Sequence, residues 1–321
     1  HAPFGRYLSE EGVDELLNSP QGTEMRGESR QVTFLVSDLR GFTSISEKLS
    51  PHEVIQILNH YFERMVEIIA RYRGTVDELQ GDGLLVFFGA PLSARDDSER
   101  AVACAIEMQS TMPEINRSQR QKNFPQLSMG IGINTGEVVV GNIGSKKRTK
   151  YGAVGTPINT TYRIESHTVG GQVLISPRTY GKISSKINIR ETFQVHFKGV
   201  EHPVTLYDVM GIEGEYTVFL PEAQAEALAH LETPLMVSCF PLAGKEVSEK
   251  SIQGQLTDLA VSEADVLFQE EIEVRSNLKL LIHTDTAQNL SDVYAKVVMV
   301  VSYAGERRQS RGRLTFTSLR Q

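Results

Sequence analysis

Residues 31–46 read QVTFLVSDLRGFTSIS. The first nine form an apolar run rich in Val, Phe and Leu, a pattern typical of a buried β-strand. Asp38 lies near the end of this run, where a lone carboxylate is costly to bury. The stretch therefore predicts a core strand that carries either a functional carboxylate or one that caps the following turn.

The sequence after this strand predicts a helix and then a β-hairpin. Ser50 fits an N-cap, Pro51 the first helical position and Glu53 the capping box, and the helical period of apolar residues runs to Gly74. Residues 75–88 then predict the hairpin, with its tight turn at 81–83.

Asp82 lies at the tip of this hairpin. If the hairpin lies beside the first strand, Asp82 and Asp38 converge. Carboxylate oxygens of this kind suit Mg²⁺ or Mn²⁺ held together with substrate phosphates. Taken alone, Asp82 equally fits a residue that only fills a tight turn.

The rest of the N-terminal two thirds extends the same pattern. We expect a helix over about 95–116, a strand pair over 127–144 with Gly136 near its turn, and a helix from about Pro157. Further short strands and a short helix complete a unit that ends near residue 211. The order βα, ββ, αβ predicts an α+β, ferredoxin-like sheet with added elements.

The pattern changes after residue 211. We assign 1–30 to a short N-terminal segment, 31–211 to the first domain and 212–233 to a polar, partly helical linker. Residues 234–321 contain six short strand patterns and no convincing long helix, which predicts a small all-β barrel.

Composition narrows the class of protein. The 321 residues carry a formal net charge of −7 without a long basic run, which argues against nucleic acid as a partner. Two cysteines far apart form no disulfide framework, so a reducing cytoplasm fits. No stretch approaches the ~18 apolar residues of a membrane span. The first residue is not Met, so a longer protein with an upstream sensor or membrane anchor also fits.

Four motifs in order resemble the class III adenylate and guanylate cyclases, and the resemblance covers about residues 4–210. The leading FGRYLS also resembles the transducer segment that often precedes such domains. The motifs are VSDLRGFTSIS (36–46), ELQGDGLLVFFG (78–89), GIGINTGEVVVGNIGS (130–145) and VGTPINTTYRIE (154–165).

The resemblance implies a role for each matching residue. Asp38 and Asp82, with the backbone of Leu39, would hold two Mg²⁺ or Mn²⁺ ions. The backbone from Leu39 through Gly41 and Phe42 to Thr43 would approach the phosphates, which a glycine makes sterically easier.

Residues from later motifs would bind the rest of the nucleotide. Asn159 would orient the ribose, and Arg163, four residues on, would stabilise charge on the α-phosphate. Lys198 matches the triphosphate lysine of the family. Arg148 matches a triphosphate arginine, although its basic cluster also fits a solvated loop.

The resemblance further implies a symmetric homodimer with two sites, each shared between the chains. Asp38 and Asp82 of one chain would face Glu78, Asn159, Arg163 and Lys198 of the other. The segment 136–144 resembles the arm that reaches over the partner.

Glu78 occupies the family's base-reading position, where adenylate cyclases carry Lys and guanylate cyclases Glu. An ionised carboxylate only accepts hydrogen bonds, and guanine presents two adjacent donors. We therefore expect GTP as substrate and cyclic GMP as product. The second base-reading position is Gly152, which offers no side chain. An adenylate cyclase and a non-catalytic nucleotide-binding module stay open as alternatives.

The C-terminal part faintly resembles a PilZ domain. Asp258 fits the family's D-x-S-x-x-G motif, but Ala260 and Glu263 replace its Ser and Gly, and no R-x₃-R motif precedes it. We therefore expect a regulatory or dimer-supporting module, and cyclic di-GMP binding is doubtful.

Overall fold

The computed structural model describes residues 27–145, 148–197, 199–221, 227–243, 246–284, 289–302 and 309–319. The chain divides into two compact units, His1–Pro221 and Glu222–Gln321. Of the predicted N-terminal segment, residues 1–26 lie outside the described residues.

The first unit is built on a sheet whose central strands are antiparallel. Their order is β2-β3-β1-β4, which is the split βαβ arrangement. Strand β1 pairs with β3 on one side and with β4 along its whole length on the other. The strands are β1 (Gly27–Leu39), β2 (Thr75–Gln80), β3 (Gly83–Phe88) and β4 (Met129–Ser145).

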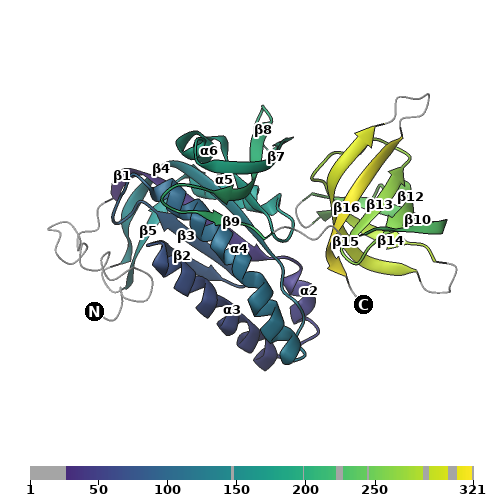
Figure 1. Ribbon diagram of the computed structural model, residues 1–321, viewed down its shortest axis with the longest axis horizontal. Helices are drawn as coiled ribbons and strands as arrows, with labels where there is room; N and C mark the ends of the chain where they lie inside the picture. The colour runs from purple at the N-terminus through teal and green to yellow at the C-terminus, as the bar shows by residue number, and fades with distance from the viewer. Residues whose placement is uncertain are drawn as a thin grey trace. The chain divides into compact units, whose positions relative to one another are not determined.

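Two long helices cover one face of this sheet, α3 (Pro51–Arg71) and α4 (Asp97–Gln121), as Figure 1 shows. The predicted capping box at the start of α3 is present, with Ser50 and Glu53 exchanging hydrogen bonds. Alternate residues of β1, such as Leu35, pack under these helices, whereas Phe34 and Val36 face a second apolar cluster on the opposite side. Because both faces of β1 are buried from Val32 to Ser37, this part of the strand is mostly apolar.

Further elements extend the sheet beyond β4. Strand β6 pairs with β4 in parallel, and β8 and β7 follow it. Strand β5 pairs with the distal half of β4 and leads into helix α5. The remaining helices and strands of the first unit are α2 (Phe42–Ser46), β5 (Arg148–Val154), α5 (Thr156–Ser166), β6 (Val173–Ile175), α6 (Pro177–Ile183), β7 (Ile187–Val195), β8 (Val204–Ile212) and β9 (Val218–Phe219).

Gly136 is not near a turn, which corrects the sequence prediction. It lies within the single long strand β4, and its pairing partner in β1 is Val32. A Cβ atom at this glycine would lie 2.5 Å from Cγ of Pro157. The glycine is needed because the start of α5 packs closely against the strand.

The predicted partly helical linker is also different in the structure. Strand β9 returns to pair with β8, and Tyr216, Val218 and Leu220 pack against the first core. The first unit therefore extends beyond residue 211. Strand β10 begins at Ala229, inside the predicted linker.

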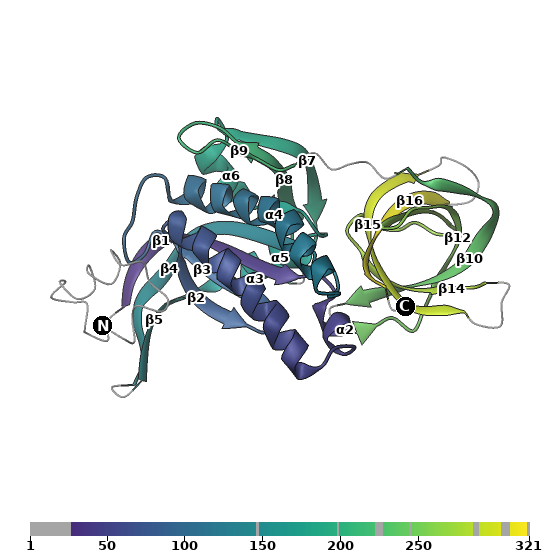
Figure 2. The same cartoon turned by 60° about the horizontal axis from the view of Figure 1, so that its bottom comes forward.

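The second unit is a β-barrel, as predicted. Its strands follow the order β11-β10-β12-β13-β16-β15-β14, and β10 also pairs with β14, which closes the sheet (Figure 2). The strands are β10 (Ala229–Ala243), β11 (Glu246–Val247), β12 (Ile252–Leu259), β13 (Glu263–Phe268), β14 (Asn277–Ile282), β15 (Leu290–Ser302) and β16 (Ser310–Leu319). In the described part of the chain, no helix is long and apolar enough to cross a membrane.

Candidate functional site

The two predicted metal carboxylates lie together. Asp38 is the penultimate residue of β1, and Asp82 lies in the turn between β2 and β3. Pairing of Ser37 with Leu84 brings this turn beside the end of β1. The two carboxyl groups lie close enough to interact, and Asp82 also accepts a hydrogen bond from the backbone N–H of Leu39.

This contact changes the titration of Asp82. Burial raises its pKa to about 7, and the neighbouring charge of Asp38 acts in the same direction. Two ionised carboxylates that interact so closely repel each other. The arrangement therefore favours either a proton or a cation between them.

The donor set fits divalent metal ions. Both side chains offer oxygen atoms, the ligands that Mg²⁺ and Mn²⁺ prefer. The described residues contain no cluster of three or more His, Cys, Asp or Glu side chains that could enclose a metal alone. Asp38 and Asp82 therefore fit a site that is completed by substrate phosphates, in which Mg²⁺ is commonly held by one or two carboxylates.

Arg40 connects the metal carboxylates to helix α5. Its Nη2 atom lies 3.5 Å from Oδ2 of Asp38 and also forms an ion pair with the buried Glu165 of α5. Burial lowers the pKa of the Arg40 guanidinium. The arginine is thus shared between two carboxylates, and it holds α5 against the end of β1.

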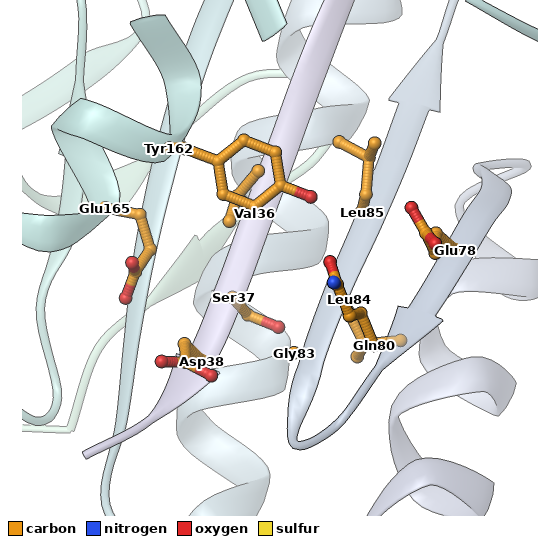
Figure 3. Close-up of a pocket in the computed structure, with 10 residues that line it drawn as sticks. All are labelled: Val36, Ser37, Asp38, Glu78, Gln80, Gly83, Leu84, Leu85, Tyr162 and Glu165. Carbon is orange, nitrogen blue, oxygen red and sulfur yellow. The ribbon is translucent and has the colours of Figure 1, made fainter. Parts of the chain in front are cut away.

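A cavity of about 180 Å³ opens between these elements. In Figure 3, Tyr162 extends from α5 across β1, Asp38 lies at the end of β1, and Glu78 stands on β2. The structure thus places Glu78, the predicted base-reading residue, and Asp38, a predicted metal ligand, along the same cavity. Its lining residues are Val36, Ser37, Asp38, Glu78, Gln80, Gly83, Leu84, Leu85, Tyr162 and Glu165.

Asn159 and Arg163 lie on α5, as predicted, and both are exposed. Thr161, Ile164 and Glu165 occupy the buried face of the same helix. The two predicted substrate residues therefore point away from the core of their own chain. This orientation leaves them accessible to a nucleotide or to another chain.

The segment between β1 and α2 makes a tight turn. Gly41 has φ 68°, in the left-handed region that glycine adopts readily. Leu39 and Phe42 are buried on either side of it, while Thr43 is exposed. The backbone N–H of Arg40 donates to the carbonyl of Ser128 at 2.7 Å. This hydrogen bond holds the turn against the residue that precedes strand β4.

A second charged pair, which the sequence interpretation missed, lies beside the predicted base-reading residues. Asp77 sits at a register shift of β2, between Val76 and Glu78, and Lys150 Nζ lies 3.2 Å from its Oδ1 atom. A Cβ atom at Gly152 would lie 3.1 Å from the same oxygen. The signal in the sequence was the Lys two residues before Gly152, since alternate residues of a strand share a face.

Two predicted triphosphate residues have no described side chain. Lys198 lies outside the described residues. Arg148 begins strand β5, where it pairs with Ser145, but its side chain is not among those described. Their predicted roles stay predictions.

Known proteins resemble this chain over about two thirds of its length. Adenylate cyclase 1 of Rhizobium meliloti (strain 1021) is 29% identical over 211 residues, which are 65% of this chain and 32% of that protein. The chain thus spans about a third of that relative's length.

Solved structures agree with this likeness. The guanylyl cyclase Cya2 is 52% identical, with a TM-score of 0.60 over 61% of this chain and 100% of that one. The adenylyl cyclase CyaB from P. aeruginosa is 34% identical, with a TM-score of 0.56 over 60% of this chain and 99% of that one.

The family model of the adenylate and guanylate cyclase catalytic domain matches residues 25–211. This range includes β1, the β2–β3 hairpin and α5, the elements that carry the carboxylates and the exposed Asn159 and Arg163. The chain belongs to the adenylate and guanylate cyclase catalytic domain family.

Proposed function

We propose that this chain is a guanylate cyclase, which converts GTP to 3′,5′-cyclic GMP and pyrophosphate in a homodimer. The observation that carries the proposal is Glu78, an exposed carboxylate on β2 beside the cavity that also contains Asp38. The 52% identity to a structure named as a guanylyl cyclase supports it.

Asp38 and Asp82, with the backbone of Leu39, would hold two Mg²⁺ or Mn²⁺ ions. Bound there, the ions would lower the pKa of the ribose 3′-hydroxyl and neutralise phosphate charge. The backbone turn at Gly41 leaves room for a phosphate oxygen close to the main chain. The chain's own contribution is to keep both carboxylates at one point, with the hairpin fixed against the end of β1.

Asn159 and Arg163 act on the reacting part of the nucleotide. Asn159 orients the ribose so that its 3′-oxygen faces the α-phosphorus. Arg163 stabilises the charge that builds on the α-phosphate while pyrophosphate leaves, a contribution for which preorganised cations are effective. Arg148 and Lys198 bind oxygens of the β- and γ-phosphates, which leave as pyrophosphate.

Glu78 selects the base. Its carboxylate accepts hydrogen bonds from the ring N–H and the exocyclic amine of guanine. Adenine presents an acceptor at the ring position, which a carboxylate repels. A paired contact of this kind is worth roughly 1–3 kcal/mol of discrimination, as bidentate contacts to bases are elsewhere.

The positions of these groups support the homodimer. Asn159 and Arg163 are exposed in the single chain, and the β4–β5 hairpin exposes apolar side chains that a second copy would cover. They are Val139, Ile143 and Val154. Exposed apolar side chains grouped on one element are typical of an interface.

The barrel is a regulatory or dimer-supporting module in this proposal. Asp258, the residue that fits a PilZ motif, accepts hydrogen bonds from His230 and Thr257 and pairs with Arg311. Since this carboxylate is already engaged, binding of cyclic di-GMP is not part of the proposal.

Product formation by the purified protein tests the proposal. GTP, ATP, CTP and UTP are offered separately with Mg²⁺ or Mn²⁺, and the cyclic products are separated by chromatography. We expect cyclic GMP to dominate, and Glu78→Ala to reduce the preference for GTP. Dominant cyclic AMP would make the chain an adenylate cyclase, the reading that the name of the Rhizobium relative favours. No product from any nucleotide would leave only a binding role.

A further inference from the structure

Helix α5 ends at a histidine that the proposed mechanism does not use. His167 is the C-cap residue of α5, and its backbone N–H donates to the carbonyl of Ile164 at 3.1 Å. The Nδ1 atom of its ring lies 2.8 Å from the carbonyl oxygen of Arg163. A carbonyl oxygen only accepts hydrogen bonds, so Nδ1 carries a proton and donates it. The histidine therefore satisfies one of the last carbonyl groups of the helix, and that group belongs to Arg163.

The same ring also contacts the segment that follows β7. The ring centroids of His167 and Phe197 lie 5.4 Å apart, and the two ring planes are inclined by 54°. Phe197 is buried, whereas His167 is partly exposed. The next residue in the sequence after Phe197 is Lys198, the predicted triphosphate lysine. His167 thus joins the last turn of α5 to the residue that precedes Lys198.

A small apolar cluster packs α5 against the strands on this side of the unit. Ile164, the neighbour of Arg163 in the chain, is fully buried in it. Because buried side chains are closely packed, a shift of one member is felt by the others. The end of α5 and the end of β7 therefore form one packed body. The buried members of the cluster are Ile164, Leu174, Val195, Phe197 and Leu206.

This packing matters because the two attached residues have different partners on one nucleotide. In the proposed function, Arg163 acts at the α-phosphate, and Lys198 binds oxygens of the phosphates that leave. The triphosphate sets the distance between these points. A displacement of about 1 Å in such an arrangement can reduce a rate by about 10²-fold. A residue that fixes α5 against the segment before Lys198 therefore contributes to both contacts.

We propose that His167 is a positioning residue, which holds Arg163 and the segment before Lys198 in one arrangement that fits a triphosphate. The inference rests on the proposed function, but it requires a nucleoside triphosphate rather than a particular base. The hydrogen bond from Nδ1 fixes the last turn of α5. The ring contact fixes that turn against Phe197. His167 itself touches no substrate.

Three replacements of His167 separate its two contacts. His167→Asn keeps an amide donor close to the position of Nδ1 and loses the ring, whereas His167→Phe keeps a ring and loses the donor. His167→Ala loses both. Since the first two variants each keep one contact, a folding defect of His167→Ala does not decide the result. His52→Ala is the matched control, because it removes an exposed histidine near the start of α3.

Nucleotide binding without turnover gives the first measurement. The nucleotide 3′-deoxy-GTP lacks the attacking hydroxyl, so calorimetry with Mg²⁺ reports its Kd on an unreacted complex. We expect Kd to rise by about fivefold or more in His167→Ala and His167→Asn, which lose the contact with Phe197. In His167→Phe and in the control it should stay within about twofold of the wild type.

Turnover of saturating GTP gives the complementary measurement. We expect kcat to fall by about fivefold or more in His167→Ala and His167→Phe, because the last turn of α5 is no longer tied to the ring. In His167→Asn it should stay within about twofold of the wild type. A residue that only stabilises the fold would lower the unfolding temperature without dividing Kd from kcat in this way.

A double-mutant cycle with Lys198→Ala tests whether His167 acts through the lysine. Two residues that act through one contact have effects that do not add. We therefore expect His167→Ala to raise Kd by less than about twofold once Lys198 is replaced. Effects that multiply in the double variant would overturn the inference.

The outcomes distinguish this inference from the proposed function. A wild-type protein that binds no nucleoside triphosphate and forms no cyclic product overturns both. Dominant cyclic AMP overturns only the guanylate assignment, and the cycle with 3′-deoxy-ATP then has to show the same dependence on Lys198. A protein that binds nucleotide, but in which every His167 variant keeps Kd and kcat within about twofold of the wild type, overturns only the role of His167.

Discussion

The two ends of the candidate site handle charge in opposite ways. At the metal end, two carboxylates share one place, and burial together with the charge of Asp38 raises the pKa of Asp82 to about 7. At the base end, burial raises the pKa of Asp77, but the nearby ammonium of Lys150 opposes that shift. The two carboxylates at the metal end repel each other, whereas Asp77 and Lys150 at the base end attract each other.

This difference indicates what each end requires from outside the chain. The pair of Asp38 and Asp82 gains stability from a cation, so it is suited to hold metal ions that arrive with a nucleotide. Asp77 and Lys150 already neutralise each other, so they are suited to hold a fixed pattern of donors and acceptors. We therefore expect mutations to separate the proposed metal binding from the proposed base selection.

Asp82→Asn is the most severe test of this separation. Asn keeps the shape of the side chain and removes its charge, so the metal end loses half of its ionised oxygen ligands. We expect kcat with GTP to fall by about 10³-fold or more, which corresponds to roughly 4 kcal/mol. The ratio of GTP to ATP in residual activity should stay close to that of the wild type. The measurement is cyclic nucleotide formation at saturating substrate.

Glu114→Gln is the matched control for that variant. Glu114 is an exposed carboxylate that pairs with Arg64 on the helical face, so its charge contributes little. We expect turnover within about twofold of the wild type, given the small value of surface ion pairs. An Asp82→Asn protein that keeps more than about a tenth of wild-type turnover would contradict the two-carboxylate metal site.

A mixing experiment tests whether the proposed metal ligands of one chain act together with Arg163 of another chain. Asp38→Ala and Arg163→Ala are each expected to lose about 10²-fold or more of the activity. In a symmetric dimer with shared sites, half of the dimers in an equal mixture are mixed, and each mixed dimer has one intact site. The mixture should therefore recover about a quarter of the wild-type rate.

The control for mixing is two chains with the same defect. Asp38→Ala combined with Asp82→Asn places both changes at the metal end, so no mixed dimer has an intact site. That mixture should stay as inactive as its components. The mixture of Asp38→Ala and Arg163→Ala chains could also fail to restore activity, although size-exclusion chromatography shows exchanged dimers. In that case the prediction of a site shared between two chains is wrong.

The sequence predicted that Asp38 and Asp82 lie close together, but it did not predict the pair of Asp77 and Lys150, for a physical reason. Asp38 lies near the end of β1 and Asp82 in the turn of the β2–β3 hairpin, so the sequence predicted that they converge if this hairpin lies beside the first strand, and the family resemblance implied the same. Asp77 and Lys150 are far apart in the chain and meet only because β2 carries a bulge and β5 returns along β4. No periodic pattern marks a bulge before the register is known.

Contacts between residues that are far apart in the sequence limited the rest of the prediction in the same way. Arg40 was read as part of a motif, but its pairing with Glu165 depends on how α5 lies against β1. Gly136 was placed near a turn because glycine commonly marks one. Its actual reason, close contact with Pro157, arises only in the folded sheet.

The smallest expected effect concerns the pH dependence of stability. The raised pKa of Asp82 means that the folded protein keeps a proton there up to about pH 7, whereas an unfolded aspartate loses it near pH 3.9. The folded state then binds more protons than the unfolded state across this interval. Stability without metal should therefore decrease as the pH rises from about 4 to about 7.

A divalent cation should remove that penalty, because it replaces the proton between the two carboxylates. We expect Mg²⁺ to raise the unfolding temperature by a few degrees more at about pH 8 than at about pH 5.5, measured by calorimetry at matched ionic strength. In Asp82→Asn one of the two charges is missing, so both the decrease with pH and the extra effect of Mg²⁺ should largely disappear. An equal effect of Mg²⁺ at both pH values would mean that the cation stabilises the protein elsewhere, and the contrast between the two ends of the site would lose its electrostatic basis.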